Sequence, residues 1–71
     1  DFFKEAVDNA NETDAIAKQD ALDLAAGRTD DIHTVMINAE KAQLALSMVV
    51  QMRNKAIDAY KNAIENNLNH E

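Results

Sequence analysis

The residues whose types and spacing could support chemistry gather in the stretch "DDIH", residues 30–33. Asp30 and His33 are three residues apart, so both side chains could contact one metal ion, or act as an acid–base pair, at the start of a helix. No third ligand lies at a matching spacing, because Glu40 is two turns further along. We therefore interpret Asp30 as a helix cap and His33 as a surface or turn-packing residue, while His70 lies in a polar tail without any matching partner.

Other motifs that carry chemistry are missing from the sequence. The spacing of the aspartates does not match a calcium loop, which needs close alternation and a central Gly. There is no Gly-rich phosphate loop, nucleophile elbow or paired-carboxylate cleft, and no Cys for a disulfide or a thiolate metal site. We expect a protein that is not an enzyme, with no catalytic, cofactor-binding or metal-binding residues. A metal-dependent enzyme built on His33 is the alternative, and stabilisation by divalent ions would support it.

The composition limits the kinds of partner that the chain can bind. The chain has 71 residues and a net charge of −6, and most of its 13 acidic residues lie in residues 1–31. An acidic balance argues against binding to nucleic-acid phosphates or anionic lipid. The longest apolar-rich stretch, residues 42–52, is far shorter than the ~20 residues of a membrane span, so we expect no membrane insertion. The opening "DFFKEAVD" has no signal-peptide pattern, and a single small domain of this kind depends on partners for stability.

One turn divides the chain, at "AAGRTDD", residues 25–31. Gly27, the only glycine, can adopt the left-handed conformation that closes a helix. Thr29 or Asp30 can then accept hydrogen bonds from the first N–H groups of a second helix, and Asp30 and Asp31 place negative charge at its positive end. The sequence predicts a helix, a tight turn and a second helix.

The first helix is expected over residues 2–26, with a packing row at alternating steps of four and three. The members of this row are mostly alanine, so they permit close approach but bury little area: Phe3, Val7, Ala10, Asp14, Ala17, Ala21 and Leu24. The polar stretch of residues 9–14 favours caps over helix interiors, so the sequence leaves open whether the helix is continuous there or frays and breaks.

The second helix is expected over residues 31–67 and carries apolar residues on three faces. The Arg53 row, which should face the core, consists of Ile32, Met36, Ala39, Gln43, Leu46, Val50, Arg53, Ile57, Tyr60 and Ile64. The Val49 row beside it consists of Val35, Ala42, Val49, Ala56 and Ala63. The Met48 face consists of Ile37, Leu44, Met48 and Met52. A helix that is apolar on several faces is normally buried on every side.

Helix lengths show that one hairpin is not enough. At 1.5 Å per residue the helices span about 37 Å and about 54 Å, so the alanine-rich first helix leaves an apolar band uncovered. We predict an all-α fold, a two-helix antiparallel hairpin over about 2–26 and 31–67, joined by a short Gly-containing turn and completed by packing with other subunits. Residues 1–71 form one domain, with a polar helix end or tail at 62–71.

Arg53 has two interpretations. Its methylenes could lie along the apolar row with the guanidinium in water or on Asp58 or Asp8, or the guanidinium could be buried in a subunit contact and bind carboxylates or carbonyls. The methionines are interpreted as adaptable packing. The predicted assembly interface consists of Leu46, Val49, Val50, Met52, Arg53, Asn54, Ile57 and Tyr60.

Residues 31–60 resemble the C-terminal helix of the flagellar hook–basal body protein FliE family. The resemblance rests on an ordered series: Asp31-Ile32-His33, Val35-Met36-Ile37, Glu40-Lys41-Ala42, Met52-Arg53-Asn54-Lys55 and Ala59-Tyr60. The aromatic residues at 2–3, the polar first helix and the lone Gly27 also fit. The tail after Tyr60 departs from the short, Met-containing end usual in the family.

The resemblance implies a structural protein of the bacterial flagellum, exported by the flagellar type III apparatus without a cleaved signal peptide. It implies a place in the periplasmic rod region of the basal body, joining the MS ring and export gate to the proximal rod. The implied partners are rod, MS-ring and export-gate proteins and other copies of the chain. The alternative from another class is a free-standing cytosolic hairpin module, a chaperone or regulator, acting as a dimer in a four-helix bundle.

Overall fold

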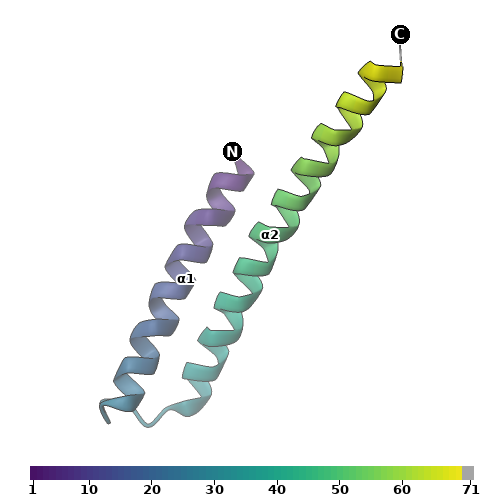
Figure 1. The fold of residues 1–71 in the computed structure, drawn as a ribbon. Coiled ribbons are helices and arrows are strands. Elements are labelled where there is room, and N and C mark those ends of the chain that lie inside the picture. The colour runs from purple at the N-terminus through teal and green to yellow at the C-terminus, as the bar shows by residue number, and fades with distance from the viewer. Residues whose placement is uncertain (70–71) are drawn as a thin grey trace.

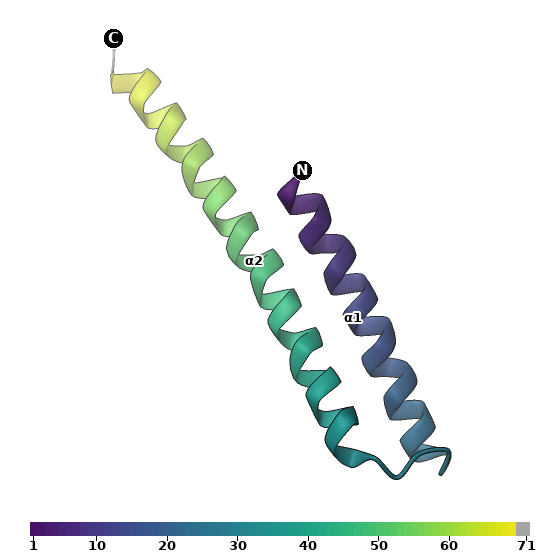
Figure 2. The same cartoon turned by 180° about the vertical axis from the view of Figure 1, so that it is seen from behind.

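The computed structural model describes residues 1–69, which form two helices, α1 (Phe2–Ala25) and α2 (Ile32–Asn69). They lie side by side and antiparallel as a hairpin (Figure 1), which confirms the predicted fold class and brings both helices within two residues of their expected bounds. The hairpin measures 66 × 17 × 14 Å. In both views α2 continues well past the start of α1 (Figure 2), so its last turns have no neighbour from α1. Of the predicted polar tail, residues 70–71, including His70, lie outside the described residues.

The first helix is continuous through residues 9–14, which answers the question that the sequence left open. The Asp1 carboxylate caps α1 by accepting a hydrogen bond of 2.9 Å from the Phe3 N–H. Within the polar stretch the Thr13 hydroxyl donates to the carbonyls of Asn9 and Ala10, at 2.9 and 3.1 Å. These bonds satisfy the Thr13 side chain inside the helix, where it would otherwise compete for backbone groups.

Gly27 closes α1 as predicted, with φ of 74°. Its N–H donates to the Leu24 carbonyl at 3.2 Å, and the Arg28 N–H donates to the Asp23 carbonyl at 2.8 Å, the two bonds of a Schellman motif. The Arg28 guanidinium and the Gln19 amide both donate to Asp23 Oδ1 at 2.9 Å. The Arg28 hydrogen bond, followed by that of Gln19, lowers the pKa of Asp23 below its ordinary value. Side chain and backbone therefore fix the same end of the helix.

Of the turn and cap residues expected from the sequence, Gly27, Asp30 and Asp31, it is Asp31 that caps α2, and the interpretation of Thr29 or Asp30 as the capping residue is wrong. Asp31 Oδ1 accepts from the Thr34 N–H at 3.1 Å, and Oδ2 accepts from the Thr34 hydroxyl at 2.7 Å. The Thr34 hydroxyl, and then its N–H, lower the pKa of Asp31. In the turn, the Thr29 hydroxyl instead accepts a hydrogen bond from the Asp31 N–H, and the Asp30 carbonyl accepts one from the Ile32 N–H. The reason for the shift is that α2 starts at Ile32, which places Thr34 at the third helical position facing Asp31.

The seam between the helices uses different rows from those expected. On α1 the partly buried residues are Ala6, Val7, Ala10, Thr13, Ala17, Asp20, Asp23 and Leu24. On α2 the partly or fully buried residues are Val35, Asn38, Ala42, Ala45, Val49 and Met52. Within residues 1–68, Ala45 alone is buried, with 5% of its surface exposed. The Val49 row thus faces α1, while the Arg53 row does not.

Three members of the predicted α1 row, Phe3, Asp14 and Ala21, are exposed. Asp14 instead pairs with Lys18 at 2.9 Å on the helix surface. The physical reason is size: small residues at Ala42 and Ala45 let the helices approach closely, and this contact turns Thr13 and Asp20 into the seam in place of Asp14 and Ala21.

A polar contact crosses the seam. The Asn38 side-chain amide donates to Asp20 Oδ2 at 2.5 Å, and both residues are partly buried. A polar pair inside an alanine-rich seam contributes little burial, but it fixes which turn of α1 lies against which turn of α2. The turn and this pair hold the hairpin in one register.

Candidate assembly interface

The Arg53 row forms an exposed apolar stripe along most of α2. The exposed fractions are 59% for Leu46, 45% for Val50, 39% for Ile57 and 69% for Tyr60. This stripe lies roughly 100° around α2 from Ala45, the centre of the seam. Of the apolar faces of α2, α1 therefore covers the Val49 row and leaves the Arg53 row exposed.

The predicted interface residues divide between these two faces. Val49 and Met52 belong to the seam with α1, where they are partly buried. Asn54 is exposed with the Arg53 row. On the other side of α2, the Met48 face is also largely exposed.

Arg53 is exposed and has no ion-pair partner among residues 1–69. Neither Asp8 nor Asp58, the acids considered for it from the sequence, lies within ion-pair distance in the described chain. A guanidinium on an exposed apolar stripe is free to bind a carboxylate of another molecule.

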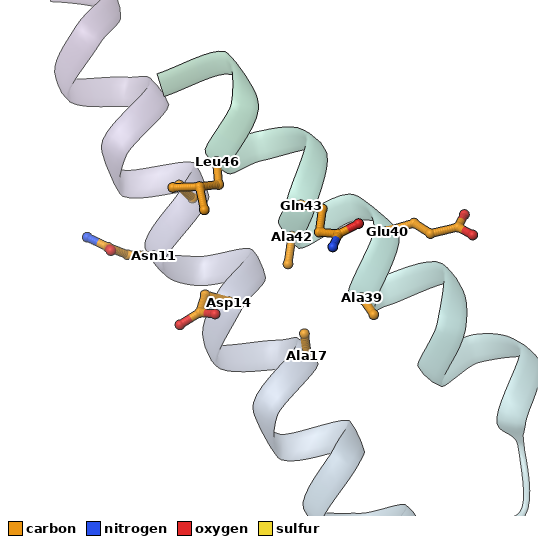
Figure 3. A pocket seen from close by; sticks show the side chains of 9 residues that line it. Asn11, Asp14, Ala17, Ala39, Glu40, Ala42, Gln43 and Leu46 are labelled. Atoms are coloured by element: carbon orange, nitrogen blue, oxygen red, sulfur yellow. The ribbon is translucent and has the colours of Figure 1, made fainter. Parts of the chain in front are cut away.

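Two grooves run along the Arg53 row, which forms one wall of each. The first, about 520 Å³, has a floor of alanines and includes Leu46 and Gln43 in its α2 wall (Figure 3). Asn11 and Asp14 line its α1 side. The second, about 330 Å³, is lined by Phe3, Arg53, Ala56, Ile57 and Tyr60. We call these two grooves together the lateral track.

Sequence reasoning did not identify the lateral track. Its floor is made by Ala10, Ala17, Ala39 and Ala42, and its far end by Phe3. Alanines at these spacings on two antiparallel helices are the available signal, because a shallow floor forms only where both helices present small side chains. Such a groove accepts the ridge of a further helix.

The hairpin exposes more surface than a compact monomer of its mass, as expected for a chain whose packing is completed by other subunits. The hairpin exposes 5945 Å². A compact monomer of 7.9 kDa is expected to expose about 4,400 Å². The excess of about 1,500 Å² is roughly twice the ~800 Å² that each partner buries in an interface of standard size.

The chemistry considered for "DDIH" finds no support in the geometry. Asp30 and His33, the pair considered from the sequence, are both exposed. In the described part of the chain, no group of three His, Cys, Asp or Glu side chains is placed to hold a metal ion. Neither helix within residues 1–69 combines the length and apolar character needed to cross a bilayer.

Comparison with known proteins points in one direction. The family model described as "Flagellar hook-basal body complex protein FliE" matches residues 1–66. A protein of that description from Halalkalibacterium halodurans is 39% identical over 59 residues, covering 83% of this chain and 58% of the relative. One from Desulfitobacterium hafniense is 42% identical over 59 residues, covering 83% and 52%.

A shorter match, with a protein of the same description from Clostridium acetobutylicum, is 55% identical over 31 residues, covering 44% of this chain and 28% of the relative. The chain spans about half the length of the first two relatives. No solved structure gives a significant match. With a family model covering nearly the whole chain and relatives that are 39% and 42% identical over 59 residues, this chain belongs to the FliE family of flagellar hook–basal body complex proteins.

Proposed function

We propose that this chain is a structural component of the bacterial flagellar basal body, without enzymatic activity, that joins the MS ring and export gate to the proximal rod through helix–helix packing. The observation that carries the proposal is the exposed Arg53 row along the lateral track of a chain whose family consists of hook–basal body proteins. A helix with an apolar face left uncovered by its own chain is suited to a site where other helices surround it.

The proposal includes partners and location. The chain packs against rod, MS-ring and export-gate proteins and against further copies of itself. It acts in the periplasmic rod region after export without a cleaved signal peptide. The acidic net charge is consistent with protein partners, since nucleic-acid phosphates and anionic lipids attract basic surfaces.

The test replaces the native protein by variants in its flagellated host. Val50→Asp and Arg53→Glu are expected to abolish rod assembly and swimming while the variants are still exported, because an unpaired charge buried in a helix contact costs several kcal/mol. The readouts are export of the chain and recovery of hook–basal bodies. Normal swimming in both variants, or absence of the wild-type chain from purified hook–basal bodies, would contradict the proposal.

The alternative, a cytosolic hairpin dimer, gives a different result. It predicts that the wild-type chain stays in the cytosol as a stable dimer whose α2 faces pair symmetrically.

A further inference from the structure

We infer that a second copy of this chain occupies the lateral track, laying the outer face of its α1 along the Arg53 row of the first copy. The inference rests on the proposed function, because it names one of the neighbours that cover this row in the assembly.

Charge complementarity is the first argument. Arg53 is the only charged member of the Arg53 row, and it is exposed and without an ion pair among residues 1–69. On α1, Glu5, Asp8 and Glu12 follow one another at steps of three and four, so they form a single exposed stripe, which we call the acidic row. Their carboxylates have no ion pairs within the described chain either, and neighbouring like charges on a helix destabilise it.

The acidic row points away from its own α2. Asp8 follows the seam residue Ala6 by two positions, which is roughly 200° around the helix. The acidic row therefore projects from the back of the hairpin, where another molecule can reach it. A guanidinium placed among its carboxylates would relieve their repulsion and satisfy Arg53 at once.

Shape supports the same arrangement. If Asp8 of one copy lies against Arg53 of another and the two helices are antiparallel, Ala15 comes opposite Leu46 seven residues further on. One more heptad brings Leu22 opposite Ala39, which lies in the floor of the 520 Å³ groove. Leu22 is 60% exposed in the single chain. Large side chains thus meet small ones at both positions, as interdigitating helices require.

The two surfaces are different, so the contact is heterologous. Each copy offers its lateral track to one neighbour and its acidic row to another, and such contacts generate rings or helical arrays. The surface excess of about 1,500 Å² corresponds to two interface patches on each copy, as this arrangement needs.

The test uses the absence of cysteine from the chain. Two differently tagged single-cysteine variants, Ala15→Cys and Leu46→Cys, are co-expressed in the flagellated host in place of the native protein. After oxidation the mixed disulfide dimer should exceed either same-variant dimer by about tenfold. Leu44→Cys replaces Leu46→Cys as the matched control, because Leu44 is similarly exposed at 64% on the opposite face. A Leu46→Cys dimer with itself as the main product, or equal yields from Leu44→Cys, would overturn the inference.

Charge reversal gives a second readout. Arg53→Glu should abolish swimming and, in the Leu46→Cys chain, should lower the mixed-dimer yield by about tenfold. Combining it with Asp8→Arg in the neighbouring copy should restore both. Failure of the double reversal overturns the second copy as occupant. If Arg53→Glu nevertheless abolishes hook–basal bodies, the proposed function stands and another flagellar protein fills the track.

Discussion

Val49 and Val50 allow the seam and the Arg53 row of α2 to be tested with the same substitution. They are adjacent and identical, but Val49 is partly buried in the seam and Val50 is 45% exposed on the Arg53 row. Fully burying a valine contributes about 1.5–3 kcal/mol, so a partner that covers the remaining 45% of Val50 adds about 0.7–1.4 kcal/mol. Aspartate at each position reports whether the side chain is covered by α1 or by another molecule.

Val49→Asp should destabilise the hairpin itself. It removes seam packing and places a carboxylate in a partly buried, apolar position, at a cost of about 2–3 kcal/mol. Val50→Asp should change the free energy of unfolding by less than about 0.5 kcal/mol, because Asp and Val have similar helix propensities and the position is half exposed. In the assembly, however, the Val50→Asp carboxylate is buried without a partner, and assembly should fail.

The assay is thermal unfolding followed by circular dichroism, paired with recovery of hook–basal bodies from cells that carry each variant. Loss of thermal stability in Val49→Asp only, with loss of assembly in Val50→Asp, is the expected pattern. Equal thermal destabilisation by both changes would refute the assignment of the seam. Full assembly of Val50→Asp would refute the proposal that another molecule covers the Arg53 row.

Three further predictions concern the turn and the seam. Asp31→Ala should lower the helical content and the thermal midpoint, and the difference from the parent should vanish on acidification. The folded pKa of Asp31 lies below its ordinary value of 3.8, so its stabilisation is complete well above pH 3.8 and is lost as the pH falls through the folded pKa. Gly27→Ala should cost about 1 kcal/mol in thermal unfolding from backbone strain alone, because an added Cβ meets nothing within 4 Å at φ +74°. Asp20→Ala should cost about 1 kcal/mol by leaving the Asn38 amide unpaired, whereas replacing both Asp20 and Asn38 by leucine should raise the thermal midpoint and loosen the register, measured by cross-linking across the seam.

Each of these has a contrary result. A pH-independent deficit in Asp31→Ala would mean that its carboxylate does not cap α2. Equal stability of Gly27→Ala and the parent would contradict the left-handed turn. Unchanged stability in Asp20→Ala would show that the pair across the seam contributes nothing.

The hairpin was predictable because its determinants are local. Gly27 is the only glycine, and the apolar periodicity on either side of it has the period of a helix. The Arg53 row was identified as a coherent stripe for the same reason. The local pattern does not determine which of several adjacent rows packs against a partner helix.

The choice of seam depended on packing between the helices. On α1 the expected and observed rows share Val7, Ala10, Ala17 and Leu24, and they differ in having Thr13 and Asp20 where Asp14 and Ala21 were expected. Thr13 and Asp14 are both short and polar, so the sequence gives no hydrophobic reason to prefer either. The decision comes from α2, where Ala42 and Ala45 permit a close approach that the bulkier Arg53 row does not. The same three-dimensional fit created the lateral track, which no single helix encodes.

The most direct test of the account is photo-crosslinking in flagellated cells, with the photoreactive residue at Val50 and a control at Leu44, which is 64% exposed on the opposite face of α2. Purified hook–basal bodies should contain Val50 adducts to another copy, or to a rod, MS-ring or export-gate protein, well above the level at Leu44. Adducts at Val50 no more abundant than at Leu44, or found only with cytosolic proteins, would contradict the claim that assembly covers the Arg53 row.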